Sequence, residues 1–139
     1  MGYRSDVAYT IRFKKPDLMA LFIGEALSKD YGKAALDECA IDHAKMQINF
    51  YAEGVKWYDS YSDVQCHEAL VQQARDWCEA DEHEHARQTG DTTYMTSEYK
   101  LGWLFTRVGE DTDDNQEECG GSYDWDWVRL SRQIIMDWA

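Results

Sequence analysis

Carboxylates are the most concentrated reactive groups of this chain, and the densest run of them lies in its second half. Asp111, Asp113 and Asn115 stand at positions 1, 3 and 5 of an EF-hand loop, where oxygen ligands on alternate residues converge on a calcium ion. Position 6 of such a loop needs glycine and is Gln116 here, and position 12 needs a bidentate glutamate and is Ser122. The sequence therefore favours a solvated acidic hairpin loop over a calcium site.

A second group of residues has the types found in transition-metal sites. His83 and His85 lie close to Glu79, Asp81 and Glu82. On a helix the two histidines would point about 160 degrees apart, so one face offers two ligands at most. The spacing of H-E-x-x-H, with histidines at i and i+4, is not present. We expect no resident metal, and the sequence carries no cofactor motif.

Asp59 and Asp63, with Tyr58 and Tyr61 beside them, are the residues best suited to acid–base catalysis. Carboxylates flanked by aromatic rings can acquire raised pKa values, and this segment joins a predicted strand to a predicted helix, where sites often form. Neither a nucleophile with its base nor a glycine-rich phosphate loop accompanies them. A turn with aromatic anchors explains the same residues without catalysis.

The net charge of −13 is unevenly distributed along the 139 residues. Residues 1–75 hold nine basic and eleven acidic residues, a net charge of −2. Residues 76–139 hold five basic and sixteen acidic residues, a net charge of −11. Such a field repels phosphate, so direct binding to nucleic acid or to an anionic membrane is disfavoured. The same field attracts basic protein surfaces.

The acidic segment is therefore a candidate ligand in itself. Its carboxylates would face a groove lined with lysine and arginine and imitate a phosphate track. Tyrosine and tryptophan, the usual anchors of protein interfaces, alternate with the acids at the end of the segment. The alternative is that the charge only keeps the protein soluble. The candidate partner-binding residues are Glu110, Asp111, Asp113, Asp114, Glu117, Glu118, Tyr123, Asp124, Trp125 and Asp126.

Length and composition predict one globular domain over residues 1–139. A chain of this length buries about two-thirds of the surface that its unfolded form exposes, and 6 Trp, 9 Tyr and 4 Phe supply large core side chains. The four cysteines form no C-x-x-C pair. The first residues are polar and no run approaches 18 apolar residues. We therefore expect a cytoplasmic protein without disulfides.

Periodicity in the first part of the chain predicts a strand followed by a helix. Apolar residues alternate with polar ones over 5–14, which is typical of a strand with one buried face. Pro16 and Asp17 favour a helix start, so we expect a helix over 17–30. Gly32 can close that helix in the left-handed conformation.

The middle of the chain predicts a short second helix, a hairpin and a longer helix. Segment 33–43 keeps helical spacing, and the alternation over 46–50 restores the strand period. Glu53-Gly54 offers a tight turn into a strand at Val55 and Trp57.

Ser62-Asp63-Val64-Gln65 has the form of a capping box, and an apolar stripe then runs to Cys78. This stripe includes His67, which we expect to be a core histidine with its hydrogen bonds satisfied. The residues after Cys78 are expected to be solvated or frayed, and 90–97 to be a loop.

The end of the chain predicts a second antiparallel pair. Leu101, Trp103 and Phe105 alternate with other residues, and 127–135 supply the last strand, joined across the acidic loop 109–121. Helices covering one face of a mainly antiparallel sheet of about five strands give an α+β fold with two or three helices.

Four segments spread over most of the chain carry a resemblance. They are MGYRSDV (1–7), VKWYDSYSDV (55–64), RVGED (107–111) and VRLSR (128–132). They resemble small tailed-phage proteins of unassigned function. None of the four is a catalytic motif, so the resemblance concerns origin and fold more than activity. It implies a phage accessory protein, and such proteins are often host-takeover or anti-defence factors.

Together these observations predict a non-enzymatic phage accessory protein that binds a basic surface of a host protein, in the manner of a nucleic-acid mimic. The first alternative is a small metal-dependent or acid–base hydrolase. The second is a virion or assembly component. Aromatic residues of the predicted last hairpin would also suit a homodimer.

Overall fold

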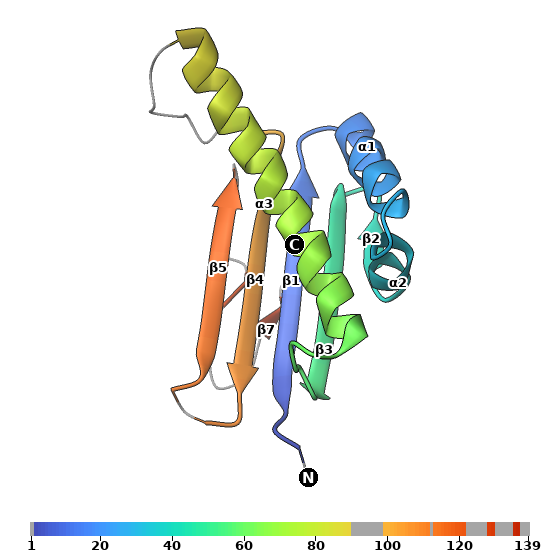
Figure 1. Cartoon of the computed structure of the whole chain (residues 1–139), viewed down its shortest axis with the longest axis vertical. Helices are drawn as coiled ribbons and strands as arrows, with labels where there is room; N and C mark the ends of the chain where they lie inside the picture. The colour runs from blue at the N-terminus through green and yellow to red at the C-terminus, as the bar shows by residue number, and fades with distance from the viewer. Residues whose placement is uncertain (1, 90–98, 112, 122–127, 130–134, 137–139) are drawn as a thin grey trace.

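The computed structural model describes residues 2–89, 99–111, 113–121, 128–129 and 135–136 (Figure 1). Its helices are α1 (Pro16–Leu27), α2 (Gly32–Asp37) and α3 (Ser62–Thr89). Its strands are β1 (Ser5–Phe13), β2 (Ala40–Asp42), β3 (Gln47–Val55), β4 (Leu101–Gly109), β5 (Asn115–Gly121), β6 (Val128–Arg129) and β7 (Ile135–Met136).

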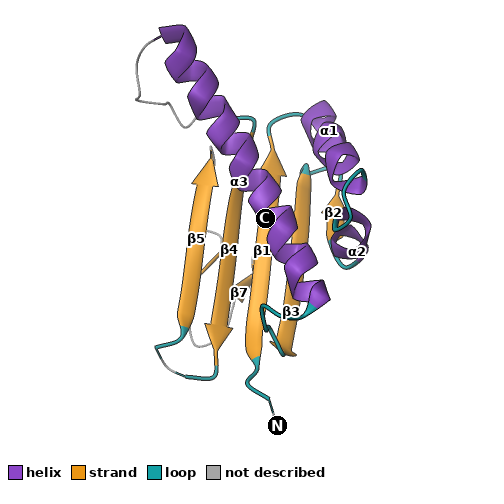
Figure 2. Ribbon diagram, viewed as in Figure 1, coloured by secondary structure: helices purple, strands orange, loops and turns teal. Residues whose placement is uncertain are grey.

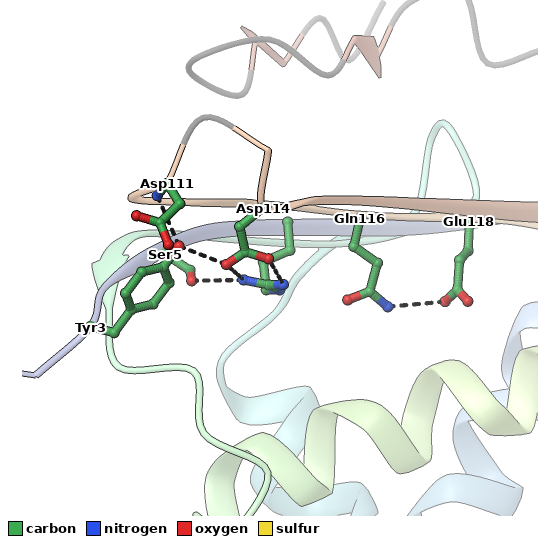
Figure 3. Close-up of polar contacts among 7 residues, drawn as sticks. Tyr3, Ser5, Asp111, Asp114, Gln116 and Glu118 are labelled. Atoms are coloured by element: carbon green, nitrogen blue, oxygen red, sulfur yellow. Dashed lines mark hydrogen bonds and ion pairs between the residues drawn. The ribbon is translucent and has the colours of Figure 1, made fainter.

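Five strands form one antiparallel sheet in the order β2-β3-β1-β4-β5. The helices lie on one side of it, with α3 running obliquely across the strands (Figure 2). β6 and β7 pair with each other in a separate sheet on the opposite side (Figures 1 and 3). The predicted α+β fold is therefore confirmed.

β1 suits the centre of the sheet because residues 7–11, in its middle, are buried on both faces. Tyr9 lies opposite Phe50 of β3 and Phe105 of β4, and its ring stacks on both, with centroids 5.1 and 6.4 Å apart. On the other face Thr10 is only 1% exposed, and its hydroxyl donates to Oδ1 of Asn49 at 2.6 Å. The sequence predicts this strand with one buried face, whereas the middle of the strand is buried on both faces.

The helices complete the core on the face that holds Tyr9. Phe22 of α1 contacts Phe13 of β1 and Trp77 of α3, with ring centroids 5.2 and 5.3 Å apart. α1 begins at Pro16 as expected, since proline fixes φ and its missing N–H would be unpaired there in any case. It ends at Leu27, three residues before the predicted end.

The predicted role of Gly32 is wrong. This residue begins α2 rather than closing α1, and its φ is not positive. The real constraint is space, because a Cβ on Gly32 would lie 1.8 Å from the carbonyl oxygen of Ala26. The predicted second helix over 33–43 is half right: α2 ends at Asp37, and β2 then pairs with β3, with Ile41 opposite Ile48.

The hairpin predicted at Glu53-Gly54 is also wrong. β3 continues through both residues to Val55, and Gly54 takes φ +64° where the register with β1 shifts between Ser5 and Val7. A glycine with positive φ inside a strand marks a bulge as well as it marks a turn. The turn that does occur precedes β3 and joins it to β2.

α3 begins at Ser62 as predicted but extends far beyond Cys78. It has 28 residues, a length of about 42 Å, and its second half runs past the ends of β4 and β5 (Figure 1). The fraying expected after Cys78 is not observed, although most side chains of that part are exposed. In the first turn the Gln65 backbone N–H donates to the Tyr61 carbonyl and its side-chain amide to the Asp59 carbonyl, in place of the predicted capping box.

The predicted final hairpin is the largest error. β4 pairs with β5, so half of the supposed acidic loop is a strand and only residues 110–114 form the turn. Gly120 suits this strand because a Cβ there would lie 2.7 Å from Nε1 of Trp103. Of the last strand expected over 127–135, the structure describes Val128–Arg129, which form β6, and Ile135, which begins β7. β6 and β7 pair with each other, so these residues belong to two strands rather than one.

We predict that Gly32→Ala destabilises the fold by about 2–3 kcal/mol, because the added methyl group overlaps the Ala26 carbonyl. Gly24→Ala is the matched control, since a Cβ at this helical position meets nothing within 4 Å. The control should raise the free energy of unfolding by about 0.5–1 kcal/mol. Urea denaturation of both variants checks this, and equal stabilities would show that Gly32 is not needed for close packing.

Candidate functional site

The candidate partner-binding residues divide into groups with different surroundings. A tight turn joins β4 to β5, in which the Gly109 N–H donates to the Asp114 carbonyl at 2.8 Å and the Asp114 N–H to the Asp111 carbonyl at 3.1 Å. Glu110, Asp111, Asp113 and Asp114 belong to this turn, whereas Glu117 and Glu118 lie on β5. Tyr123, Asp124, Trp125 and Asp126 lie outside the described residues.

Asp114 is held inside a hydrogen-bonded network (Figure 3). Its carboxylate accepts two bonds from Arg107, at 2.6 and 3.1 Å, and one from the Tyr3 hydroxyl at 2.7 Å. The Tyr3 hydroxyl in turn accepts the Asp111 N–H at 2.9 Å, and Arg107 also donates to Ser5 Oγ at 3.2 Å. The network ties the start of the chain to the β4–β5 turn. The bonds from Arg107 lower the pKa of Asp114 to about 2.

Glu118 is also engaged within the protein. It points to the side of β5 that faces α3, as do Asp114 and Gln116 (Figure 3). Its carboxylate lies 2.5 Å from Arg75 of α3, whose guanidinium sits 4.7 Å from the centre of the Trp103 ring. The carboxylates of Asp114 and Glu118 therefore each form an ion pair that supports the fold.

Four other acidic side chains of the candidate set are exposed: Glu110, Asp111, Asp113 and Glu117. Glu110 accepts the backbone N–H of Arg4 at 2.7 Å and remains exposed. Glu117 alternates with Glu118 along β5, so it points to the opposite face of the sheet. The exposed carboxylates thus occupy the turn and the outer part of β5.

The second half of α3 adds further acidic residues. Asp81 is nearly buried, accepts the Lys100 N–H at 3.1 Å and pairs with Lys100 Nζ at 3.3 Å. Glu84 pairs with Arg87 on the same helix, and the Tyr99 hydroxyl donates to Glu82 at 2.5 Å. Glu79 is exposed.

Asp59 and Asp63, the candidates for catalysis, line different pockets. Asp59 lies with Arg107 in a pocket of about 370 Å³, and Asp63 lies with His67 in one of about 300 Å³. The first pocket also contains Glu68, a residue that sequence reasoning missed. Burial, and secondly the charge of Asp59, raise the pKa of Glu68. Nothing in the sequence around Glu68, which lies on the first turns of α3, indicates that its pKa is raised.

His67 is the core histidine that the sequence predicted. It is 2% exposed, with Nδ1 2.6 Å from the Tyr9 hydroxyl and Nε2 2.9 Å from Oε1 of Glu38. Both bonds are satisfied when Nε2 carries the proton and Nδ1 accepts from Tyr9. Burial lowers its pKa below 6.5.

Metal and membrane sites were also considered. Within the described ranges, no group of three or more His, Cys, Asp or Glu side chains is arranged to hold a metal ion. His83 and His85 are both on α3. No helix in the part of the chain that the structure describes is long and apolar enough to cross a bilayer.

We predict that Asp114→Asn lowers the free energy of unfolding by about 1 kcal/mol at pH 7, since the ion pair with Arg107 is partly exposed. The pKa of Asp114 is lower in the folded state, so its stabilising effect is present above pH 3.8 and is lost as the pH falls towards about 2. The free energy of unfolding of the wild-type protein and of Asp114→Asn, measured against pH, should differ in this window. Identical loss of stability in acid would contradict the assignment of this effect to Asp114.

A second pH effect is expected at His67. Because its folded pKa lies below 6.5, the unfolded chain binds more protons there, and stability falls as the pH drops below about 6.5. Glu38 and Asp63, which face the ring, oppose this shift without reversing it. His67→Phe should flatten the stability profile between pH 7 and pH 5. An unchanged slope would show that His67 does not titrate differently on folding.

Comparison of the chain with family models, with curated proteins and with solved structures found no match.

Proposed function

We propose that the protein is a phage accessory protein of the host cytoplasm that binds a basic surface of a host protein or complex. The strongest support is that basic side chains in the second half of the chain pair with carboxylates of the same half. The second half has five basic residues, and the three whose side chains are described each pair with a carboxylate of the same half. These residues are Arg87, Lys100 and Arg107. Internal pairing therefore leaves the large acidic excess of this half uncompensated.

The placement of the exposed acids also favours an interface. The acidic turn joins β4 and β5 at one end, while the second half of α3 runs past their other end (Figure 1). Glu117 lies between them on β5, which is about 23 Å long. Acidic side chains thus extend along one edge of the molecule over a length suited to a protein contact.

The mechanism would be occupancy of the basic surface. Long-range attraction speeds the encounter, and contacts at short range set the lifetime of the complex. A basic surface covered in this way no longer binds nucleic acid. The resemblance to phage proteins adds the expectation that the target belongs to the host, with anti-defence inhibition as the purpose.

A second candidate, acid–base hydrolysis, is favoured by one observation. Glu68 has a raised pKa in a pocket that it shares with Asp59, the pairing of carboxylates from which a general acid can arise. A hydrolase screen of the protein and of Glu68→Gln tests this. Turnover that is lost in the variant would support the enzyme over the binding protein.

We predict that Asp111→Asn, Asp113→Asn and Glu117→Gln, combined in one variant, weaken partner binding. Asp114 and Glu118 are left intact because their ion pairs support the fold. A control that removes the same charge from the first half combines Asp17→Asn, Asp30→Asn and Glu53→Gln, all of which are exposed in the native protein.

Partners are captured from nuclease-treated host lysate and eluted with graded salt. The dissociation constant of each captured protein is then measured against salt concentration. The edge variant should bind about tenfold more weakly and show a shallower salt dependence, while the control stays close to wild type. Equal effects of the two variants would mean that only net charge matters and would refute binding through this edge.

A further inference from the structure

β5 is an edge strand whose outer side is open. Among the described strands it pairs only with β4, and residues 115–119 are all exposed. An open edge of this kind presents backbone N–H and C=O groups that another chain can pair with. Proteins commonly receive an extended peptide at such an edge.

The hydrogen-bond pattern shows which backbone groups face outward. In the β4–β5 hairpin the Gly109 N–H donates to the Asp114 carbonyl, and in an antiparallel ladder every second pair along the strand repeats that bonding. The pairs that follow in this series are Arg107 with Gln116 and Phe105 with Glu118. Gln116 and Glu118 therefore direct their backbone groups at β4.

The opposite side of β4 agrees with this assignment. The Lys14 N–H donates to the Lys100 carbonyl at 3.1 Å, continuing the β1–β4 ladder at the even-numbered residues of β4. The odd-numbered residues of β4 are thus the ones that bond β5. It follows that Glu117 and Cys119 direct their N–H and C=O groups away from the sheet.

The charge around this edge decides between possible occupants. A second copy pairing through β5 would bring two sets of Glu117 and Glu118 within a few residues of each other, and like charges at such distances are destabilising. An extended segment with lysine or arginine side chains would instead meet Glu117 and the acidic turn. Charge therefore favours a basic strand over a second copy.

The two faces of the added strand would meet different surroundings. On the Glu117 face its side chains lie beside exposed carboxylates. On the Glu118 face they border a groove of about 480 Å³ between α3 and the sheet, which is lined mostly by polar side chains. Arg75 and Glu118 already form an ion pair on this face, so the basic side chains of the segment are better placed on the Glu117 face. The geometry fits a segment in which basic residues alternate with uncharged ones.

We propose that β5 receives such a segment of the partner protein by strand addition, with main-chain hydrogen bonds to Glu117 and Cys119. This inference rests on the proposed function and specifies how the basic partner is held. Carboxylates select the charge of the segment, and the backbone edge selects its extended conformation.

The test uses a nine-residue peptide that alternates lysine with valine, and the same peptide with its lysine backbone amides methylated. The two have equal charge, but the second cannot donate the main-chain bonds. The first should bind wild-type protein about three- to tenfold more tightly at low salt, measured by fluorescence anisotropy. It should also slow hydrogen exchange at the Glu117 and Cys119 amides.

Cys119→Pro gives the matching change in the protein, because it removes an outward N–H without altering charge, and proline is tolerated on the open side of an edge strand. It should weaken binding of the unmethylated peptide about threefold or more relative to Cys119→Ala. The peptide comparison on wild-type protein stands even if this variant does not fold.

Equal affinity for the two peptides would overturn strand addition. If that shared binding still falls with salt and in the variant lacking Asp111, Asp113 and Glu117 charges, the proposed function survives. If neither peptide binds, strand addition fails, and the capture of partners from host lysate decides the proposed function independently. Protection of the Glu117 and Cys119 amides that rises with protein concentration in the absence of peptide would identify a second copy as the occupant and would also overturn the inference.

Discussion

The burial of β1 on both faces and its pairing on both edges is the constraint on which the other strands depend. Tyr9 and Thr10 are adjacent, point to opposite faces and are each 1% exposed, so this strand has to be central. β3 and β4 take the positions beside it, and the next strand along the chain can only extend the sheet outward. A polar, acidic strand is tolerated there because an edge exposes its side chains to water. The acidic excess is thereby placed at the border of the sheet.

Internal ion pairs then determine which carboxylates are left for the proposed partner. Asp114 and Glu118 hold the turn and β5 against Arg107 and Arg75. This pairing stabilises the edge on which Glu117 and the turn acids are displayed. In the proposed function, different residues of the same acidic segment support the fold and bind the partner. The carboxylates paired with arginine hold β5 and the turn in place, and the exposed carboxylates supply the negative field.

Sequence periodicity was sufficient for elements whose apolar residues repeat regularly. Alternation predicted β1, Pro16 indicated the start of α1 to within one residue, and the segment from Ser62 indicated the start of α3. Sequence patterns fail where long-range contacts decide, because Gly32 and Gly54 resemble local turn signals. Gly32 instead packs closely against the Ala26 carbonyl, and Gly54 lies at a bulge opposite β1. β5 was missed because its polar residues show no alternation, as an edge strand exposed on both faces has no reason to show any.

The sequence predicts which residues make up the candidate site, but not which of them pair with other side chains of the protein. Sequence alone singled out the acidic segment, and no pattern within it distinguishes Asp114, which meets Arg107 and Tyr3, from Asp113, which is exposed. The same limit applies to Glu68, whose raised pKa depends on its surroundings in the fold and on the charge of Asp59. Ion pairing between residues far apart in the chain is set by the fold, so it becomes visible only with the structure.

We have proposed that exposed carboxylates of the β4–β5 edge contact a basic partner. Carbodiimide labelling of carboxylates, read by mass spectrometry in the free and partner-bound protein, tests this contact. We predict that labelling of Glu110, Asp111, Asp113 and Glu117 falls on binding, while labelling of Asp17, Asp30 and Glu53 does not change. Undiminished labelling of the edge, with protection elsewhere, would contradict it.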